Sequence, residues 1–459
     1  MKKDILRRAF LWVLAVLMLT GIAMPAALAE EEPCTLWLVT EESTSAGMNA
    51  AIIAEAAQFQ EEHPGVSIKI DILPNQKDER AEYLETLREK MRNGEGPDIF
   101  MLPTRTVLAL DGITYRRIEA LFPDVAHEME SGTFADVSSF YDRDTVLDKE
   151  ALNQSIMNAG TRDSARYVLP LRFSAQVIFA FEELLADSNI SEASLTRNID
   201  GMMQIALDTK NKTLAACADV SSMPTVFSGF ASDDIPAPDT QQVASYMKRY
   251  QALRAMRGAD EIERSGRFDF LLYHNEPFPA AYNDLLCDGL NFLAASKKTG
   301  TTLLTYPQRT TSGDTVACVV YYGAVSSSCK APETAYEFLR RFLMEDAVGD
   351  NEQTLLHGEW RLSPLESSWP VRTTGSVAAM WEKIAVTLSD GILKNVQLND
   401  ADFPVMETQF DIVYFPVRNK AAAILSQLND ANNNYAATDV DIDALANDLI
   451  ASLAKNTNQ

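Results

Sequence analysis

The sequence predicts an α/β protein of two lobes built on mainly parallel sheets flanked by helices. Three observations support this prediction. The chain has 459 residues, which is long for one compact core. A strand–helix–strand–helix–strand pattern occupies residues 36–102, and such alternation gives right-handed crossovers and a parallel sheet. A second strand–helix block occupies residues 301–342.

Hydrophobic periodicity defines the elements of the first block. A short apolar run, a run that alternates apolar with polar residues and a second apolar run predict three strands. Between them, apolar residues recur at helical spacing, and Pro64 and Gly94 mark the ends of two helices. The predicted strands lie at residues 36–39, 66–72 and 99–102.

The later chain alternates between regular and loop-like segments. A Leu-Pro pair leads into a strand predicted at residues 177–181. Residues 221–240 are rich in Ser, Pro and Asp and are expected to form a loop, which a helix over residues 241–258 follows. Pro332 begins a further helix, at a position where proline is favoured. Two more β-like runs precede it, at residues 301–306 and 316–325.

The first 29 residues have the pattern of a secretory signal peptide. Basic residues precede an apolar run over residues 10–24, and Ala27-Leu28-Ala29 forms a small-x-small cleavage site. The apolar run is short for a membrane span, and no later stretch is long and apolar enough to cross a bilayer. We therefore expect cleavage before Glu30 and a mature protein outside the cytoplasm. An uncleaved signal anchor is the alternative.

Charge and cysteine usage restrict the partners. The formal net charge of −25 repels nucleic acid and anionic lipid, so neither is expected as a partner, and attraction to a cationic substrate is an alternative to plain solubility. The five cysteines show no CxxC spacing, so no zinc or thioredoxin-like motif is predicted. Cys318 and Cys329 could pair, but we expect buried thiols that act as small apolar groups.

No motif predicts catalysis, a cofactor or a metal. The four histidines form no HExxH motif, and there is no GxSxG elbow. Gly94-x-Gly96 lacks a third glycine and follows a helix, unlike a nucleotide-binding loop. Asp439-x-Asp441-x-Asp443 lacks the glycine and glutamate of an EF-hand, so we expect it to cap a helix. A carboxylate pair suited to glycoside hydrolysis is not excluded, which leaves a secreted glycan-acting hydrolase as an alternative.

Two blocks of the chain resemble one protein family. The first reads FQEEHPGVSIKIDIL and, further on, NGEGPDIFML. The second reads TTLLTYPQRTTSGDTVACVVYYGAV followed by APETAYEFLRRFLMED. Both resemble blocks of the family 1 extracellular solute-binding proteins, the ligand receptors of ABC importers. Weaker resemblances lie at residues 362–372 and 441–454. The residues of the second block that fit the family pattern are Pro307, Ala335, Tyr336, Glu337, Phe338 and Leu339.

Two features depart from the family pattern. Many membrane-tethered members carry a lipobox cysteine directly after the signal, whereas Cys34 follows Glu-Glu-Pro beyond the expected cleavage site. The tryptophan-containing helix start that usually follows the first crossing is absent from residues 189–200. Lipid anchoring is therefore not predicted, and no particular sugar subgroup is assigned.

The resemblance implies a periplasmic-binding-protein-like fold: two lobes, each a mainly parallel sheet flanked by helices, are joined by hinge crossings and close around a ligand. Lobe 1 is then expected to combine residues 30–171 with 306–356, and lobe 2 residues 172–305 with 357–459. The implied function is capture of a small polar solute, a sugar or oligosaccharide above all, by a monomer that delivers it to ABC permease subunits. A sensor or adhesin with the same fold is a further alternative, beside the hydrolase.

The ligand-binding residues are expected where strands and crossings end. A carbohydrate offers hydroxyl edges and flatter apolar faces, which polar and aromatic side chains can meet. Ligands of open α/β sheets bind at the carboxyl ends of the strands. Family members contact ligand near the same positions. The candidates are Glu41, Ser43, Thr104, Arg105, Phe173, Ser174, Tyr322 and Trp360.

Several aromatic and charged residues, both among these candidates and beside them, have a structural alternative to ligand contact. Trp37 lies within an apolar run and is expected to belong to the core. Tyr321 and Tyr322 point to opposite faces of a strand, so at most one can face the cleft. Phe173 can pack at the hinge instead of contacting ligand, and Arg105 can pair with a neighbouring carboxylate.

Overall fold

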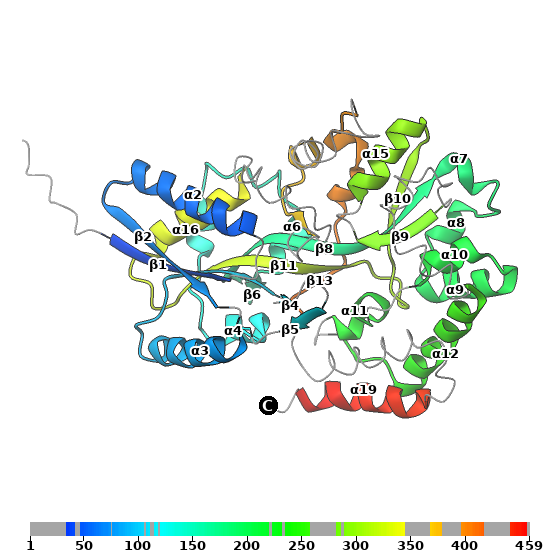
Figure 1. The fold of residues 1–459 in the computed structure, drawn as a ribbon, viewed down its shortest axis with the longest axis horizontal. Helices are drawn as coiled ribbons and strands as arrows, with labels where there is room; N and C mark the ends of the chain where they lie inside the picture. Colours follow the sequence, from blue (N-terminus) through cyan, green and yellow to red (C-terminus); the bar gives the residue numbers. More distant parts are fainter. Residues whose placement is uncertain are drawn as a thin grey trace, which may run out of the picture.

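The protein has an elongated, two-part arrangement in which long strands connect one half to the other (Figure 1). The computed structural model describes residues 34–41, 46–74, 76–104, 107–110, 114–117, 120–219, 223–231, 235–257, 281–285, 289–344, 368–378, 396–416 and 441–456. The predicted signal peptide lies outside the described residues.

One nine-stranded sheet runs through both halves. Its main path has the order β10-β8-β11-β3-β1-β2, while β9 and β12 pair with β8 and β13 pairs with β11. The strands are β1 (Cys34–Glu41), β2 (Val66–Leu73), β3 (Ile99–Pro103), β8 (Val168–Phe181), β9 (Ala281–Leu285), β10 (Leu303–Pro307), β11 (Val316–Val325), β12 (Trp369–Pro370) and β13 (Ile412–Tyr414).

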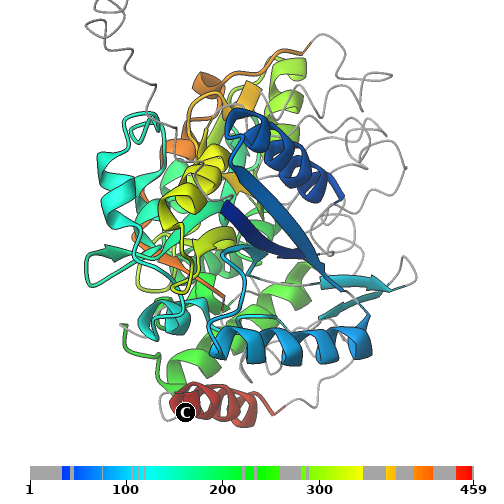
Figure 2. The ribbon, with the colours of Figure 1, turned by 90° about the vertical axis from the view of Figure 1, so that its left-hand side faces the viewer.

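The first half contains the predicted parallel block. Strands β1, β2 and β3 cover the three predicted strands, and β1 pairs in parallel with both of the others. Helices α2 (Ala46–Glu62) and α3 (Lys77–Arg92) lie on opposite faces of β1 and β2 (Figure 2). Helix α16 (Pro332–Arg340) begins at Pro332 as predicted and packs beside α2, where the rings of Phe59 and Phe338 meet at 5.5 Å.

Strand β8 carries the chain into the second half, and β10 and β11 bring it back. Both returning strands pair antiparallel with β8, on opposite sides of it, and so does β9. A chain that leaves and returns along one strand must reverse its direction. The strands that pair with β8 are therefore antiparallel to it, whereas β13 pairs in parallel with β11.

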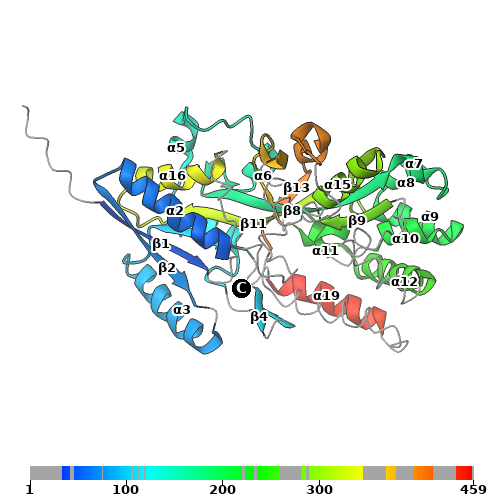
Figure 3. The same cartoon turned by 45° about the horizontal axis from the view of Figure 1, so that its top comes forward.

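The second half is rich in helices. Its larger helices are α9 (Ile199–Thr209), α12 (Thr240–Arg257), α15 (Gly289–Thr299) and α19 (Ile442–Asn456), and α19 lies alongside α12 (Figure 3). Helix α12 matches the prediction for residues 241–258. The segment expected to be a loop contains two single turns, α11 (Met223–Val226) and η1 (Ser228–Phe230).

Short elements complete the described parts of the chain. The helices are α4 (Val125–Glu130), α5 (Ser138–Arg143), α6 (Gln154–Asn158), α7 (Glu182–Leu185), α8 (Glu192–Leu195), α10 (Lys212–Cys217), η3 (Arg341–Leu343), η5 (Asp400–Asp402) and η6 (Pro404–Glu407). The strands are β4 (Val107–Leu110), β5 (Thr114–Arg117), β6 (Thr161–Arg162) and β7 (Ala165–Arg166), which form two separate hairpins.

The side chains of β8 alternate between two apolar clusters. Phe173, Val177 and Phe179 belong to the main cluster, which extends from the first half to α15. Ile178 and Ala180 belong to a second cluster, built largely by α9, α10, α12 and α19. Successive side chains of a strand point to opposite faces, so one strand forms a wall of both cores.

The described cysteines are free. Cys318 lies inside β11, opposite Ser174, whereas Cys329 lies beyond the end of that strand. The pairing considered from the sequence therefore does not form. Cys217 is fully enclosed, and burial raises the pKa of its thiol to about 12, as expected for a thiol that packs as a small apolar group. Cys287 lies outside the described residues.

Candidate functional site

Five of the eight predicted site residues lie in the described parts of the chain. Ser43, Arg105 and Trp360 lie outside the described residues, and their role stays a prediction. The other five are placed around the carboxyl ends of β1 and β3 and along the middle of β8 and β11. They are Glu41, Thr104, Phe173, Ser174 and Tyr322.

Glu41 ends β1 and forms a buried ion pair with Arg80 of α3. The two guanidinium nitrogens donate to its two carboxylate oxygens at 2.7 and 2.6 Å. Arg80 Nη1 also donates to the carbonyl of Pro74, just after β2, at 3.0 Å. Glu41 thus ties the ends of β1 and β2 to α3. No local sequence pattern distinguishes Arg80, which is one of many charged residues in a polar helix.

A buried polar network continues from Glu41 across the strand ends. Asn49 of α2 donates to the carbonyl of Glu41 at 2.9 Å and accepts from the Thr40 hydroxyl at 3.2 Å. The Tyr321 hydroxyl lies 3.4 Å from that of Thr40 and donates to the carbonyl of Met101 in β3 at 3.0 Å. Side chains from α2, β1 and β11 therefore hold the carboxyl ends of the strands together.

Thr104 links the end of β3 to β11. Its hydroxyl donates to the carbonyls of Val319 and Val320 at 2.8 and 3.2 Å, and the residue is only 4% exposed. Its backbone N–H donates to Val320 as well. In this structure, the Thr104 side chain therefore stabilises the pairing of β3 with β11.

The two predicted aromatic contacts in the described residues are core residues in this structure. Phe173 is fully buried and meets Phe410 edge to face at 5.9 Å. Tyr322 is 1% exposed and packs between Phe134 and Phe415, and burial raises the pKa of its hydroxyl well above the ordinary value. Tyr321 and Tyr322 have different neighbours, as expected for opposite faces of a strand.

Ser174 is the predicted site residue whose side-chain hydroxyl has no hydrogen-bond partner in the described structure. Its hydroxyl oxygen is enclosed and makes no hydrogen bond with the described residues. Ser174 pairs with Cys318 of β11, next to the pair formed by Phe173 and Val319. Because Thr104 bonds to the same stretch of β11 from the other side, Thr104 and Ser174 flank this strand at neighbouring positions.

Arg172 is a second residue that the sequence analysis missed. It lies on β8, half-buried, and donates to the hydroxyl and the carbonyl of Ser368 at 2.9 and 2.7 Å. Arg172, Ser174 and Gln176 are half-buried and alternate with buried Phe173 and Ala175. This period of two is the signal that could have extended the predicted strand backwards from residue 177.

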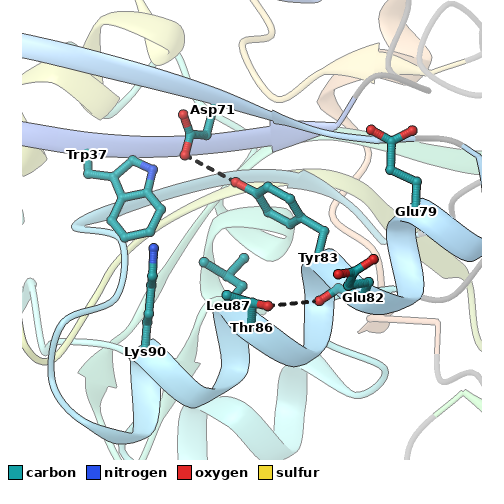
Figure 4. Close-up of a pocket in the computed structure, with 8 residues that line it drawn as sticks. All are labelled: Trp37, Asp71, Glu79, Glu82, Tyr83, Thr86, Leu87 and Lys90. Carbon is teal, nitrogen blue, oxygen red and sulfur yellow. Dashed lines mark hydrogen bonds between the residues drawn. The ribbon is translucent and has the colours of Figure 1, made fainter.

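A cavity of about 360 Å³ lies elsewhere, between α3 and the β1–β2 edge of the sheet (Figure 4). Its lining residues are Trp37, Asp71, Glu79, Glu82, Tyr83, Thr86, Leu87 and Lys90. Trp37, expected in the core, is half-buried: it packs against the main cluster and also lines this cavity. The difference arises because β2 is an edge strand, so α3 covers this face of the sheet only in part.

Asp71 and Trp37 organise the charges in this cavity. The Tyr83 hydroxyl and the Lys69 ammonium both lie 3.1 Å from Asp71 Oδ2. Partial burial, with a further contribution from Asp71, raises the pKa of Tyr83 to about 12. The Lys69 and Lys90 ammonium groups lie 4.9 and 5.3 Å from the centre of the Trp37 ring, in cation–π geometry.

The described residues contain no group of three or more His, Cys, Asp or Glu side chains that could hold a metal ion. Asp441 accepts from the backbone N–H of Ala444 at 3.0 Å at the start of α19, which confirms its predicted capping role. Within the same parts of the chain, no helix has both the length and the apolar character needed to cross a membrane.

Solved structures with a similar fold are numerous. No protein-family model matches the chain, and no curated protein matches it by sequence. An extracellular solute-binding protein of family 1 from Alicyclobacillus acidocaldarius shares 13% identity with a TM-score of 0.51, covering 93% of this chain and 99% of that one. A sugar transporter from Rhizobium etli, in an open conformation, shares 14% identity with a TM-score of 0.52, covering 92% and 99%.

A de novo designed cysteine esterase is also similar, with 12% identity and a TM-score of 0.54, covering 93% and 98%. The other neighbours are mostly solute-binding proteins, but the same fold can carry other functions. At these identities the likeness concerns the fold, and it extends over nearly the whole of each chain. The protein has the two-lobe α/β fold of the family 1 extracellular solute-binding proteins.

Proposed function

We propose that this protein is an exported, non-enzymatic receptor that captures a carbohydrate between its lobes and delivers it to an ABC importer. The observation that carries the proposal is the course of β11, which runs between β3 and β8 where the halves join. At that place Thr104 and Ser174 flank the strand, close to the network around Glu41. The fold likeness to solute-binding proteins supports the same function.

The proposed lobes follow from the sequence: the buried residues of the second apolar cluster all lie within the proposed lobe 2, whereas the main cluster includes residues of both lobes. Lobe 1 combines residues 30–171 with 306–356, and lobe 2 combines residues 172–305 with 357–459. Strands β8 and β11 run from one half toward the other, and α9, α12 and α19 build a cluster of their own. Rotation about these connecting strands is the proposed closing motion, as periplasmic binding proteins close by hinge bending.

In the proposed mechanism the ligand selects the closed form. A ligand shifts this equilibrium only as far as it binds the closed form more tightly than the open form. Micromolar affinity corresponds to about −8 kcal/mol, which suits a receptor that collects scarce solute. The closed, loaded monomer then docks on the permease subunits.

Two observations support a carbohydrate as the solute. The enclosed hydroxyl of Ser174 lacks a partner among the described residues, and a sugar hydroxyl can both donate to it and accept from it. The similar protein from Rhizobium etli is named a sugar transporter. We also expect Trp360 to lie in a loop and to supply an aromatic surface for the apolar face of a sugar.

A thermal-shift screen tests this proposal. The mature protein is heated with a panel of monosaccharides, oligosaccharides, polyols, amino acids and short peptides. A ligand at 100 times its Kd stabilises the folded state by about 2.7 kcal/mol, which raises Tm by several degrees. Stabilisation by one group of sugars is the expected result. If no solute stabilises the protein, the binding function is contradicted; if only peptides do, the substrate class is wrong.

A second assay separates the receptor from a glycan-acting hydrolase. The stabilising sugar is incubated with the protein and then analysed by mass spectrometry, with chromogenic glycosides as additional substrates. A receptor returns the sugar unchanged. Turnover that disappears when a pair of carboxylates is mutated would establish the hydrolase instead.

A further inference from the structure

We propose that the cavity between α3 and the β1–β2 edge is a second binding site, for a neutral oligosaccharide, on the outside of the first half. It lies apart from the strand ends that carry the predicted solute site, and its lining comes from β1, β2 and α3 alone (Figure 4). Its volume of about 360 Å³ is within the range of small-molecule sites.

The walls of the cavity provide apolar surfaces for a flat ligand. Trp37 and Tyr83 stand on its two sides, and Leu87 forms part of the floor (Figure 4). Aromatic side chains bind the C–H faces of sugar rings by burying apolar area while their polar atoms reach hydroxyl groups. Tyr83 is held in place by its hydrogen bond to Asp71.

Polar groups on the rim are available for hydrogen bonds. The Lys90 ammonium makes no hydrogen bond or ion pair with the described residues and only approaches the Trp37 ring. The carboxylates of Glu79 and Glu82 likewise have no described partner, although the Glu82 carbonyl accepts from Thr86. The rim therefore offers both a donor and acceptors.

The indole N–H of Trp37 lacks a hydrogen-bond acceptor among the described residues. It is enclosed, makes no hydrogen bond with the described residues, and lies on the edge of the ring nearer Asp71 and Tyr83 (Figure 4). A buried donor without an acceptor destabilises a protein. A hydroxyl oxygen that enters beside Asp71, when a lysine side chain moves aside, would supply this acceptor.

The mixture of charges selects a neutral ligand. An anion in the cavity would lie close to Asp71, Glu79 and Glu82, and a cation would lie close to Lys69 and Lys90. Like charges brought together in a partly buried site repel each other. A polyhydroxylated, uncharged ligand can donate to the carboxylates and accept from the ammonium group, so it satisfies both.

The test follows the indole N–H signal of Trp37 in the mature, 15N-labelled protein. The signal is assigned by its loss in Trp37→Phe. Three trisaccharides serve as probes: maltotriose, which is neutral, tri-galacturonic acid, which is anionic, and fully deacetylated chitotriose, which is cationic. We expect maltotriose to shift the signal with a millimolar Kd and the charged sugars to bind about tenfold more weakly. No shift with any probe, or tighter binding of a charged one, overturns the proposal.

Variants of α3 locate the bound sugar. Lys90→Ala removes the donor and is expected to weaken maltotriose binding about fivefold. Arg92→Ala is the matched control, because it removes another exposed cation of the same helix that does not line the cavity. Equal losses in both variants, or no loss in Lys90→Ala, would show that the sugar binds elsewhere.

The outcome is distinguishable from that of the proposed function. Trp37→Phe is expected to keep the full thermal stabilisation by the transported solute, because the cavity lies outside the predicted site. If the screen finds no stabilising solute but the Trp37 signal responds to maltotriose, the outer site stands and the receptor function fails. If a solute stabilises the protein but the Trp37 signal does not respond to maltotriose, only the outer site is rejected.

Discussion

Polar and charged residues have different surroundings in two regions of the molecule: the carboxyl ends of β1 and β3, and the cavity beside α3. At the strand ends, Glu41, Arg80 and Thr104 are buried, and their polar atoms bond to the protein itself. In the cavity, Glu79, Glu82 and Lys90 are accessible, and their charged groups have no described hydrogen-bond or ion-pair partner. A polar residue at a strand end can therefore be structural, and enclosure by neighbouring elements decides which role it has.

The largest expected effect comes from breaking the buried ion pair. Arg80→Met leaves the Glu41 carboxylate buried without its guanidinium, which should lower the free energy of unfolding by about 3–5 kcal/mol. Urea denaturation of the mature protein measures the change. Arg92→Met, on the exposed face of the same helix, should change it by no more than about 0.5 kcal/mol.

The double variant Glu41→Gln/Arg80→Met refines this comparison. Removing both charges should recover part of the stability lost in Arg80→Met, because no unpaired charge remains buried. A single variant that loses less than about 1 kcal/mol would show that the pair is not structural.

A smaller effect, of opposite sign, is expected at Ser174. Ser174→Ala removes an enclosed hydroxyl that has no described partner, so the free energy of unfolding should stay the same or rise by up to about 1 kcal/mol. Affinity for the stabilising sugar should fall if this hydroxyl contacts it. A marked loss of stability would instead indicate that the hydroxyl is bonded within the protein, and calorimetry on both forms distinguishes the two results.

The smallest effect concerns the titration of Tyr83 at the cavity. Its pKa is raised to about 12 in the folded protein, so folding favours the neutral phenol. The stability linked to this group is fully present below pH 10, the ordinary pKa of tyrosine, and is lost as the pH rises toward 12. Tyr83→Phe should abolish this part of the alkaline loss.

Ultraviolet difference titration measures this last effect directly. The wild-type minus Tyr83→Phe spectrum should show one tyrosinate that forms near pH 12. A transition near the ordinary value would mean that neither burial nor Asp71 acts on this hydroxyl.

Local periodicity was sufficient to predict much of the first half. The predicted strands became β1, β2 and β3, the two helices between them became α2 and α3, and Pro332 begins α16. Such elements depend on side chains that are near in sequence, so their pattern is visible in a single chain. The strand predicted at residues 177–181 was too short, because the Leu-Pro pair and three polar residues masked the period of two in β8.

The roles of the candidate side chains depended on distant partners. Glu41 is paired with a residue 39 positions away, and Thr104 bonds to carbonyls more than 200 positions away. No local sequence pattern predicts such contacts. The cavity at Trp37 likewise required knowing that β2 is the edge strand and that α3 covers it only in part.

The sequence by itself determined the α/β class, the order of the main elements and the resemblance to solute-binding proteins, because these follow from short-range periodicity and motif order. Only the tertiary structure decided which polar groups bond to other parts of the protein and which have no partner among the described residues. Burial and hydrogen-bond satisfaction are properties of the packed chain, and they become defined when distant strands and helices come together.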